Sequence, residues 1–384
     1  MHQRSIPFSA FVKAALYGRK GYYRRKLDIG RKGDFFTSPS LTPLFGKTLA
    51  NFFYKIISNK KITGPITLIE FGSHNGKLMK DVLDFLLKHH AEIYQRLEVC
   101  LEDGNSYYKT ERLNNLEKHK QKIIDMATLE GKNSTAIVFC NELFDAFPFD
   151  RCVFRSGDFF QINVKFRVGI TGPPASKHQM RGYPDEGPVY PIISFFLQNS
   201  KVIEEREELA SDRVLKQISR FKLQPKENFF FEIPYDNNHN PDVFLSRLEY
   251  CQFENCFLLI IDYGDKSEFF NTTEDPFGTA RCFYNHKVSR NFYENIYFQD
   301  ITCDVNFSLL SQIGYAHGFE EILFASQSKF LIDSNILDIF EEEKKNLPGK
   351  EVQELKRLLL PNSMGDKFKV LLLEQKKRKR KDTR

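Results

Sequence analysis

Residues 66–76 read Ile-Thr-Leu-Ile-Glu-Phe-Gly-Ser-His-Asn-Gly, and this stretch decides the fold. Its first half is short, apolar and partly β-branched, which is typical of a buried strand. Gly72 and Gly76 then permit a tight turn with positive φ, and from Leu78 onward apolar residues recur every four positions, as on one face of a helix. The stretch therefore predicts a strand, a glycine turn and a helix, which is a joint that positions nucleotide-like cofactors.

A second predicted strand, residues 97–101, ends at Glu102, where a carboxylate can accept hydrogen bonds from ribose hydroxyls. Dinucleotide sites favour three glycines in G-x-G-x-x-G, whereas only two glycines are present here. An acidic strand end followed by a glycine turn instead favours S-adenosyl-L-methionine (SAM). We therefore expect SAM as the cofactor, with binding residues Glu70, Gly72, Gly76, Glu102 and Asn141.

Other apolar runs extend the α/β pattern along the chain. A helix is expected over 44–57, a hairpin over 151–166 that turns at 156–158, and a further helix over 195–221. Further strands are expected at 135–140, 229–233, 257–261 and 368–373. Ligands of open α/β sheets bind at the carboxyl ends of strands, so Gly72, Glu102, Asn141 and Asp262 should converge.

The predicted fold class is α/β, a class I SAM-methyltransferase (Rossmann-like) sheet with an N-terminal cap and inserted and C-terminal additions. A Gly- and Pro-rich loop is expected over 169–191. The predicted segments are an aromatic and glycine-rich cap (1–60), the first part of the core (61–150), an inserted hairpin and helical segment (151–225), the rest of the core (226–375) and a disordered basic tail (376–384).

Composition narrows the function classes. The 384 residues are 41% hydrophobic, and no apolar run approaches the roughly 20 residues of a membrane span, so we expect no membrane insertion. Seven scattered cysteines predict reduced core thiols and no metal site. Residues 376–384 hold seven basic residues and one acidic residue, which accounts for the whole net charge of +6. The rest of the chain carries equal numbers of basic and acidic residues, which argues against a surface dedicated to double-stranded nucleic acid. Only the tail offers weak attachment to RNA.

With these motifs assembled, the chain resembles the MidA-like SAM-dependent methyltransferase family, which includes the mitochondrial arginine methyltransferase that assists respiratory complex I assembly. The motif near the start leaves no room for a transit peptide, so a bacterial cytoplasmic location is expected. Ser73, His74 and Asn75 depart from the family's usual glycine-rich turn, and Ser40 stands where an acidic residue is usual. The resemblance rests on Ala15-Leu16-Tyr17, Gly21-Tyr22-Tyr23, residues 33–39, Phe45-Gly46, Glu70-Phe71-Gly72 with Gly76, residues 141–148, Asp262-Tyr263-Gly264, Asp300-Ile301-Thr302 and Met364-Gly365.

The resemblance implies a protein arginine as methyl acceptor, with a respiratory-complex subunit as a possible partner. A carboxylate fork can orient a guanidinium, and Glu142 and Asp145, which follow a strand end, are the candidate catalytic pair. Alternatively, Asp145 caps a helix and Glu142 is a solvated turn residue. Asp262 either orients the substrate or Tyr263, or caps a backbone segment.

An aromatic cap of Tyr22, Tyr23 and Phe35 is expected over the cofactor, where it can exclude water and face the sulfonium. Two other functions stay open. The chain can be a weak or inactive assembly protein on the same fold, because its glycine turn is altered. It can also methylate RNA or a small molecule, with the basic tail holding RNA.

Overall fold

The computed structural model describes residues 3–27, 30, 33, 36–129, 134–168, 200–234, 240–251, 253–346 and 349–375. Its main sheet follows the order β3 (Leu97–Glu102), β2 (Ile66–Phe71), β4 (Thr135–Asn141), β9 (Asn255–Asp265), β15 (Phe368–Gln375) and β14 (Phe319–Ser326), and β13 (Val305–Asn306) pairs with the end of β9. The strands β3, β2, β4 and β9 are parallel, while β15 is antiparallel to both of its neighbours. This arrangement confirms the predicted α/β fold class.

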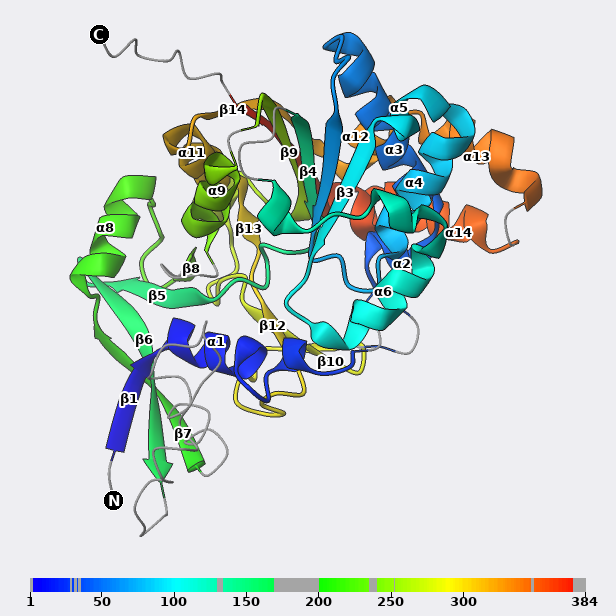
Figure 1. Cartoon of the computed structure of the whole chain (residues 1–384). Coiled ribbons are helices and arrows are strands. Elements are labelled where there is room, and N and C mark those ends of the chain that lie inside the picture. The colour runs from blue at the N-terminus through cyan, green and yellow to red at the C-terminus, as the bar shows by residue number, and fades with distance from the viewer. Residues whose placement is uncertain are drawn as a thin grey trace, which may run out of the picture.

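Helices cover both faces of this sheet because successive side chains of each strand point to opposite faces (Figure 1). Leu68, Ile137 and Leu259 pack on one side, whereas Ile69 and Val138 pack on the other. The first side carries α3 (Leu44–Asn59), α4 (Lys77–His89), α12 (Gln327–Asp333), α13 (Ile336–Glu343) and α14 (Glu351–Leu359), and the second carries α9 (Pro241–Tyr250) and α11 (Phe307–Ala316). The short helices α5 (Ala91–Gln95) and α6 (Lys109–Asn115) flank β3.

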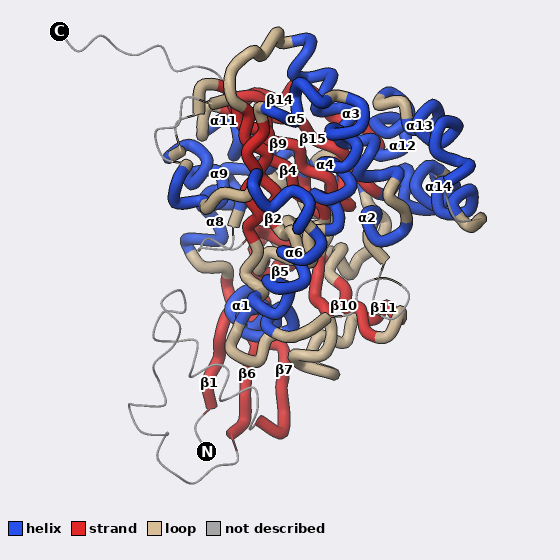
Figure 2. The backbone as a smooth tube through the Cα atoms, turned by 45° about the vertical axis from the view of Figure 1, so that its right-hand side comes forward, coloured by secondary structure: helices blue, strands red, loops and turns tan. Residues whose placement is uncertain are grey.

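Two smaller sheets lie beyond the carboxyl ends of the parallel strands (Figure 2). One has the order β1 (Gln3–Pro7), β6 (Asp158–Val168), β5 (Phe149–Arg155) and β8 (Phe230–Pro234), with β7 (Ser200–Leu209) paired to β6. The other has the order β11 (Lys287–Ser289), β10 (Arg281–Tyr284) and β12 (Asp300–Thr302). Helix α1 (Phe8–Tyr17) shares one hydrophobic cluster with both sheets. The N-terminal segment is thereby fixed opposite the main sheet.

Most of the predicted elements are confirmed, but the helix over 195–221 is wrong in part. Residues 195–199 lie outside the described residues, residues 200–209 form strand β7, and Asp212–Phe221 forms helix α8. Glu and Arg favour a helix locally, yet the segment pairs along the length of β6, and this tertiary pairing overrides the local preference. The predicted loop over 169–191 and the tail over 376–384 lie outside the described residues.

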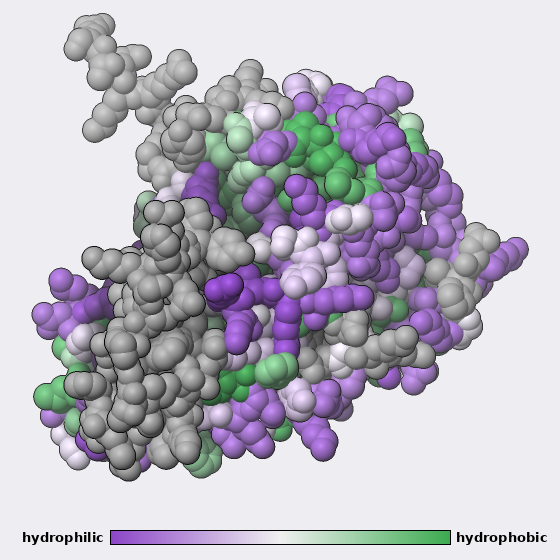
Figure 3. Space-filling model, turned by 60° about the horizontal axis from the view of Figure 1, so that its bottom comes forward, coloured by the Kyte–Doolittle hydropathy of each residue, from purple (hydrophilic) through white to green (hydrophobic). Residues whose placement is uncertain are grey.

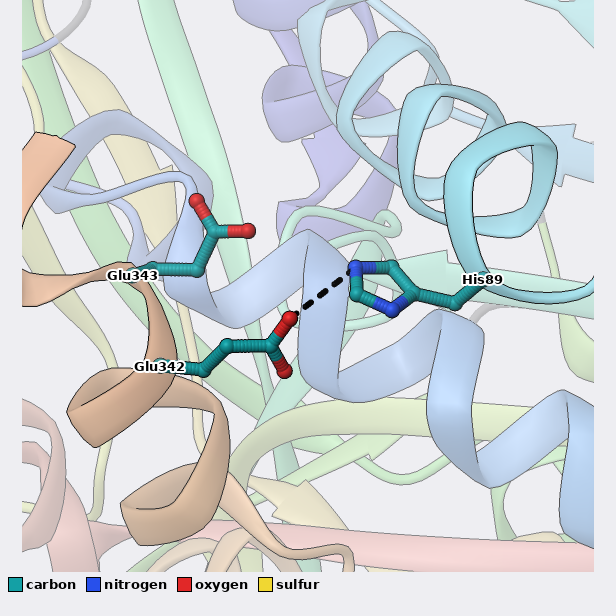
Figure 4. A group of neighbouring side chains, drawn as sticks. All are labelled: His89, Glu342 and Glu343. Carbon is teal, nitrogen blue, oxygen red and sulfur yellow. Dashed lines mark ion pairs between the residues drawn. The ribbon is translucent and has the colours of Figure 1, made fainter.

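An ion-pair cluster ties the C-terminal helices to the core. Glu343 on α13 accepts from Lys47 on α3 at 2.8 Å and from Lys88 on α4 at 2.7 Å. These two lysines lower the pKa of Glu343 to about 2. Figure 4 shows His89 beside Glu342, with their ion-pair atoms 3.8 Å apart. Because two lysines already neutralise Glu343, the group is explained as an ion-pair cluster between helices, without a metal ion.

On the face in Figure 3, hydrophilic side chains cover most of the described surface, and a hydrophobic area interrupts them in the upper half. Among the described residues, no helix combines the length and apolar character that crossing a bilayer requires.

Candidate active site

A cavity of about 1720 Å³ opens at the carboxyl ends of β2, β3 and β4. Its far wall comes from the N-terminal segment and from β10 and β12. Six of the seven predicted site residues border it, namely Glu70, Gly72, Glu102, Asn141, Glu142 and Asp145. Gly76 lies just behind the cavity as the N-cap of α4. Of the four residues at strand ends that we expected to converge, Gly72, Glu102 and Asn141 therefore border one cavity, and Asp262 does not.

The glycine turn adopts the backbone that its sequence predicts. Gly72 and Gly76 have φ of 71° and 75°, a region that favours glycine. At Gly76 an added Cβ would lie 2.8 Å from Cγ of Arg112, so steric space also requires glycine there. The amide of Gly72 donates to the carbonyl of Glu102 at 2.9 Å. This bond joins the turn to the end of the neighbouring strand.

His74, which replaces the usual middle glycine, does not fill the cavity. Its φ is 42°, and its ring packs against Tyr108 with 3.8 Å between ring centroids. The His74 amide donates to Oδ2 of Asp103 at 2.7 Å, and Nε of Arg112 donates to the His74 carbonyl at 2.9 Å. Burial lowers the pKa of His74, which favours the neutral form of the ring. Histidine therefore fits the turn because the segment after β3 holds both its backbone and its ring.

Five buried polar atoms at the cavity wall have no hydrogen-bond partner among the described residues. They are Oε2 of Glu70, Oγ of Ser73, Nε2 of His74, Oδ1 of Asn141 and Oδ1 of Asp145. Burial raises the pKa of Glu70 to about 8, although the Met79 amide donates to this carboxyl. SAM carries an ammonium, ribose hydroxyls and an adenine amine, which are the donors that such oxygens can accept. The residues present therefore fit this cofactor.

Glu102 stands at the end of β3, half-buried at the cavity wall. Burial raises its pKa, and Asp125 adds to this effect. Its predicted role as acceptor for ribose hydroxyls is compatible with this position, and it stays a prediction.

Glu142 and Asp145 follow β4 and face the same cavity. Oε1 of Glu142 accepts hydrogen bonds from the Asn141 side-chain amide at 2.7 Å and from the Ser38 backbone amide at 3.2 Å. Neither of these two bonds involves Oε2 of Glu142. Oδ2 of Asp145 accepts the Tyr263 hydroxyl, and Oδ1 of Asp145 has no partner among the described residues. Each carboxylate thus has one oxygen held by the protein and one that these bonds leave available.

The electrostatics of this pair follow from burial. Desolvation raises the pKa of Glu142 to about 8 and the pKa of Asp145 to about 6, and the charge of Asp145 raises the pKa of Glu142 further. Glu142 also has a φ of 53°, an uncommon backbone for a residue other than glycine. Strain and disfavoured charge at the same residue are typical of functional sites. The alternative that Asp145 caps a helix does not hold, since β5 and not a helix follows this loop. Glu142 is half-buried at the cavity wall, so its role in catalysis stays a prediction.

Asp262 supports the loop and does not border the cavity. Its Oδ2 accepts the amides of Leu143, Phe144 and Asp145 at 3.2, 2.9 and 3.3 Å, and its Oδ1 accepts the Tyr263 amide at 2.9 Å. Of the two roles considered for Asp262, the backbone cap is therefore the one that the contacts support.

The aromatic cap differs in part from the prediction. Tyr23 borders the cavity, and its hydroxyl donates to Asp300 at 2.9 Å, whereas Tyr22 is buried in the hydrophobic cluster of α1. Tyr17, which the prediction omitted, stacks on Tyr23 with 5.4 Å between centroids. Phe35 lies outside the described residues.

Sequence reasoning missed several residues of the wall. Arg281 lies over the Tyr263 ring at 4.6 Å and donates to Asp304 at 2.6 Å. Asp103 accepts a hydrogen bond from the His74 amide. Its role could have been predicted from the sequence, because it directly follows the strand-end residue Glu102. Arg281 and Asp304 carry no local signal, because Arg281 reaches the site on strand β10 and Asp304 on the connection between β12 and β13.

Gln327 on α12 is another residue without a sequence signal. It is fully buried, its Oε1 accepts the Ser38 hydroxyl at 3.0 Å, and its Nε2 donates to the Leu358 carbonyl at 3.2 Å. Because the Ser38 amide holds Glu142, Gln327 acts on this carboxylate through Ser38.

We expect Gln327→Leu to lower the free energy of unfolding by about 1–2 kcal/mol, since it leaves buried polar groups unpaired. Methyl transfer should fall several-fold while SAM affinity is kept, because Glu142 loses its fixed position. Urea unfolding, calorimetry with SAM and transfer rates measure the three effects. Gln353→Leu, at an exposed position of α14, is the matched control. Equal losses in both variants would contradict the positioning role.

Similarity to known proteins extends over most of the chain. A family model described as "Putative S-adenosyl-L-methionine-dependent methyltransferase" matches residues 48–324, well over half of the chain. A crystal structure from Burkholderia thailandensis, bound to S-adenosyl-homocysteine, is 20% identical with a TM-score of 0.74, covering 97% of this chain and 88% of that chain. A native structure from the same organism gives a TM-score of 0.73 at 20% identity, covering 97% and 87%. At this identity both show the fold.

Curated relatives match over a shorter stretch. The mitochondrial protein arginine methyltransferase NDUFAF7 homolog of Caenorhabditis elegans is 38% identical over 78 residues, and human NDUFAF7 is 42% identical over 82 residues. Each match covers 20% of this chain and 18% of the relative. The matched stretch thus spans less than a fifth of the length of these relatives. The family model carries the assignment and confirms SAM as the cofactor. The chain belongs to this S-adenosyl-L-methionine-dependent methyltransferase family, the MidA-like family that its motifs resemble.

Proposed function

We propose that this methyltransferase acts on an arginine side chain of a protein. The observation that carries the proposal is the pair Glu142 and Asp145, two carboxylates at one strand end that each have one oxygen held by the protein. A guanidinium presents a planar fork of N–H donors that suits two such oxygens. The short matches to protein arginine methyltransferases support the same acceptor.

The chemistry follows from this arrangement. When bound, SAM supplies a methyl group on a positively charged sulfur. Glu142 and Asp145 can hold two nitrogens of the acceptor, which places positive charge on those nitrogens and leaves the third with a more available lone pair. That nitrogen forms a bond to the methyl carbon while the carbon–sulfur bond breaks, and one acceptor proton is released. Glu142, with a pKa raised to about 8, can accept this proton near neutral pH.

The acceptor protein is the part of the proposal that needs direct identification. We propose a protein partner, with a respiratory-complex subunit as one candidate from the family resemblance. Incubating the purified protein with methyl-labelled SAM and cell extract, followed by mass spectrometry, should find label on arginine. Label on RNA or on a small molecule, or no label at saturating SAM, would overturn the proposed acceptor.

The proposal predicts a pH dependence. The fork binds a guanidinium as carboxylates, and the pKa values of Asp145 and Glu142 are raised to about 6 and about 8. Therefore kcat/KM should rise with pH between about 6 and 8 and then level off. The bound cation favours ionised carboxylates, so kcat should level off at a lower pH than kcat/KM. Initial rates across this range measure both, and a profile that falls with rising pH would contradict the role of the fork.

A further inference from the structure

Among the described residues, three large apolar side chains on the cavity wall are exposed. Phe36, Phe269 and Val288 are 37%, 46% and 60% exposed, and all three border the cavity. They come from the segment before α2 (Ser38–Leu41), from α10 (Ser267–Thr272) and from β11, and the first of these segments lies far from the other two in the sequence. Exposed apolar residues that gather at one opening mark a binding surface more often than residues scattered singly. We name these three side chains the apolar rim.

The rim adjoins a strand edge. Strand β11 is at the end of its sheet, and Lys287, Val288 and Ser289 are all exposed. Tyr284 pairs with Lys287 across a two-residue turn, Asn285-His286, in which φ is 50° and 60°. In such a hairpin the pair beside the turn exchanges hydrogen bonds, so at the next position the N–H and C=O of Val288 point outward. An extended chain can pair with these groups.

Three carboxylates lie on the cavity wall behind the rim. They belong to Glu142, Asp145 and Asp300, and the same wall holds basic residues such as Arg281. His286, which also borders the cavity, stacks on Phe36 with 5.1 Å between ring centroids. A cationic side chain is complementary to these carboxylates, and apolar side chains are complementary to the rim. The volume of about 1720 Å³ exceeds what one cofactor and one guanidinium need.

We infer that the apolar rim and β11 dock an extended segment of the acceptor polypeptide, in which apolar residues flank the arginine that enters the cavity. This inference rests on the proposed function and adds the sequence class of its substrate. The enzyme then selects its acceptor through contacts away from the reacting atoms. Changes to these contacts should therefore alter the binding of the acceptor more than the rate of the methyl-transfer step.

Short synthetic peptides test it. Each carries one central arginine between either apolar or polar flanking residues, and methyl transfer from labelled SAM gives kcat and KM. The wild type should prefer apolar flanks. The double variant Phe269→Gln/Val288→Thr should lose this preference, with kcat/KM for apolar-flanked peptides about tenfold lower, chiefly through KM. SAM affinity by calorimetry should stay unchanged.

The matched control is Tyr315→Gln, because Tyr315 is 74% exposed and does not border the cavity. The single variant Phe269→Gln, at an exposed position, is used if the double variant melts early. If the wild type methylates peptide arginine regardless of the flanks, or if the rim variants behave like the control, the docking inference is wrong while the proposed function stands. If the wild type methylates no peptide arginine but labels another acceptor class, the proposed function itself fails.

Discussion

Glu142→Gln should lower the rate of methyl transfer to arginine at least ~10²-fold while SAM affinity stays within about threefold. The glutamine side chain is isosteric, and its oxygen can still accept from Asn141 and Ser38. The charge that holds the guanidinium is lost. Asp145→Asn should act in the same direction, since Asp145 is the other half of the fork. Transfer rates and calorimetry with SAM separate the two effects.

The same substitution should stabilise the fold at high pH. The pKa of Glu142 is raised to about 8, so the folded state holds a proton that the unfolded state has already released between pH of about 4.5 and 8. Stability of the wild type therefore falls as pH rises through this window. Glu142→Gln should raise the free energy of unfolding by about 1–3 kcal/mol above pH 8 and have little effect below pH 4.5.

Urea unfolding at the two pH values measures this gain. Glu274→Gln is the matched control, because the Glu274 side chain is 92% exposed and lies outside the cavity wall. A Glu142→Gln variant that is fully active would show that Glu142 does not belong to the fork. A variant that is less stable than the wild type at high pH would show that the charge of Glu142 is not disfavoured in the folded state.

Asp262→Ala is the second change with a large expected effect. It removes the acceptor of four backbone amides, three of which belong to the loop that carries Glu142 and Asp145. Buried donors would be left unpaired, so we expect a loss of about 3–5 kcal/mol in the free energy of unfolding. In the molecules that stay folded, methyl transfer should fall at least ~10²-fold, because the loop no longer holds the fork.

Asp262→Asn keeps one acceptor oxygen and should give an intermediate loss. Asp125→Ala is the control, since Asp125 accepts the Ala127 amide at 2.9 Å on an exposed turn, where the cost should be about 1 kcal/mol. Urea unfolding and transfer rates measure both variants. Losses of similar size at Asp262 and Asp125 would contradict the central support role of Asp262.

Local sequence was sufficient for the elements that carry the cofactor turn. The continuous apolar runs of β2, β4 and β9 predict strands buried on both faces, and Gly72 and Gly76 predict the turn between strand and helix. The placement of Glu102 and Asn141 at strand ends follows from the same periodicity. The segment over 200–209 shows the limit, because its residues favour a helix and only the partner strand β6 makes it a strand.

The sequence by itself determined the sheet, the glycine turn and the two carboxylates after β4, because these features depend on backbone preferences and on burial over a few neighbouring residues. Only the tertiary structure decided that His74 packs against Tyr108, that Gln327 holds Ser38 against Glu142, and that Arg281 faces Tyr263. The physical reason is that the energy of a contact depends on distance in space, and residues 289 positions apart, such as Ser38 and Gln327, meet only after the chain has folded.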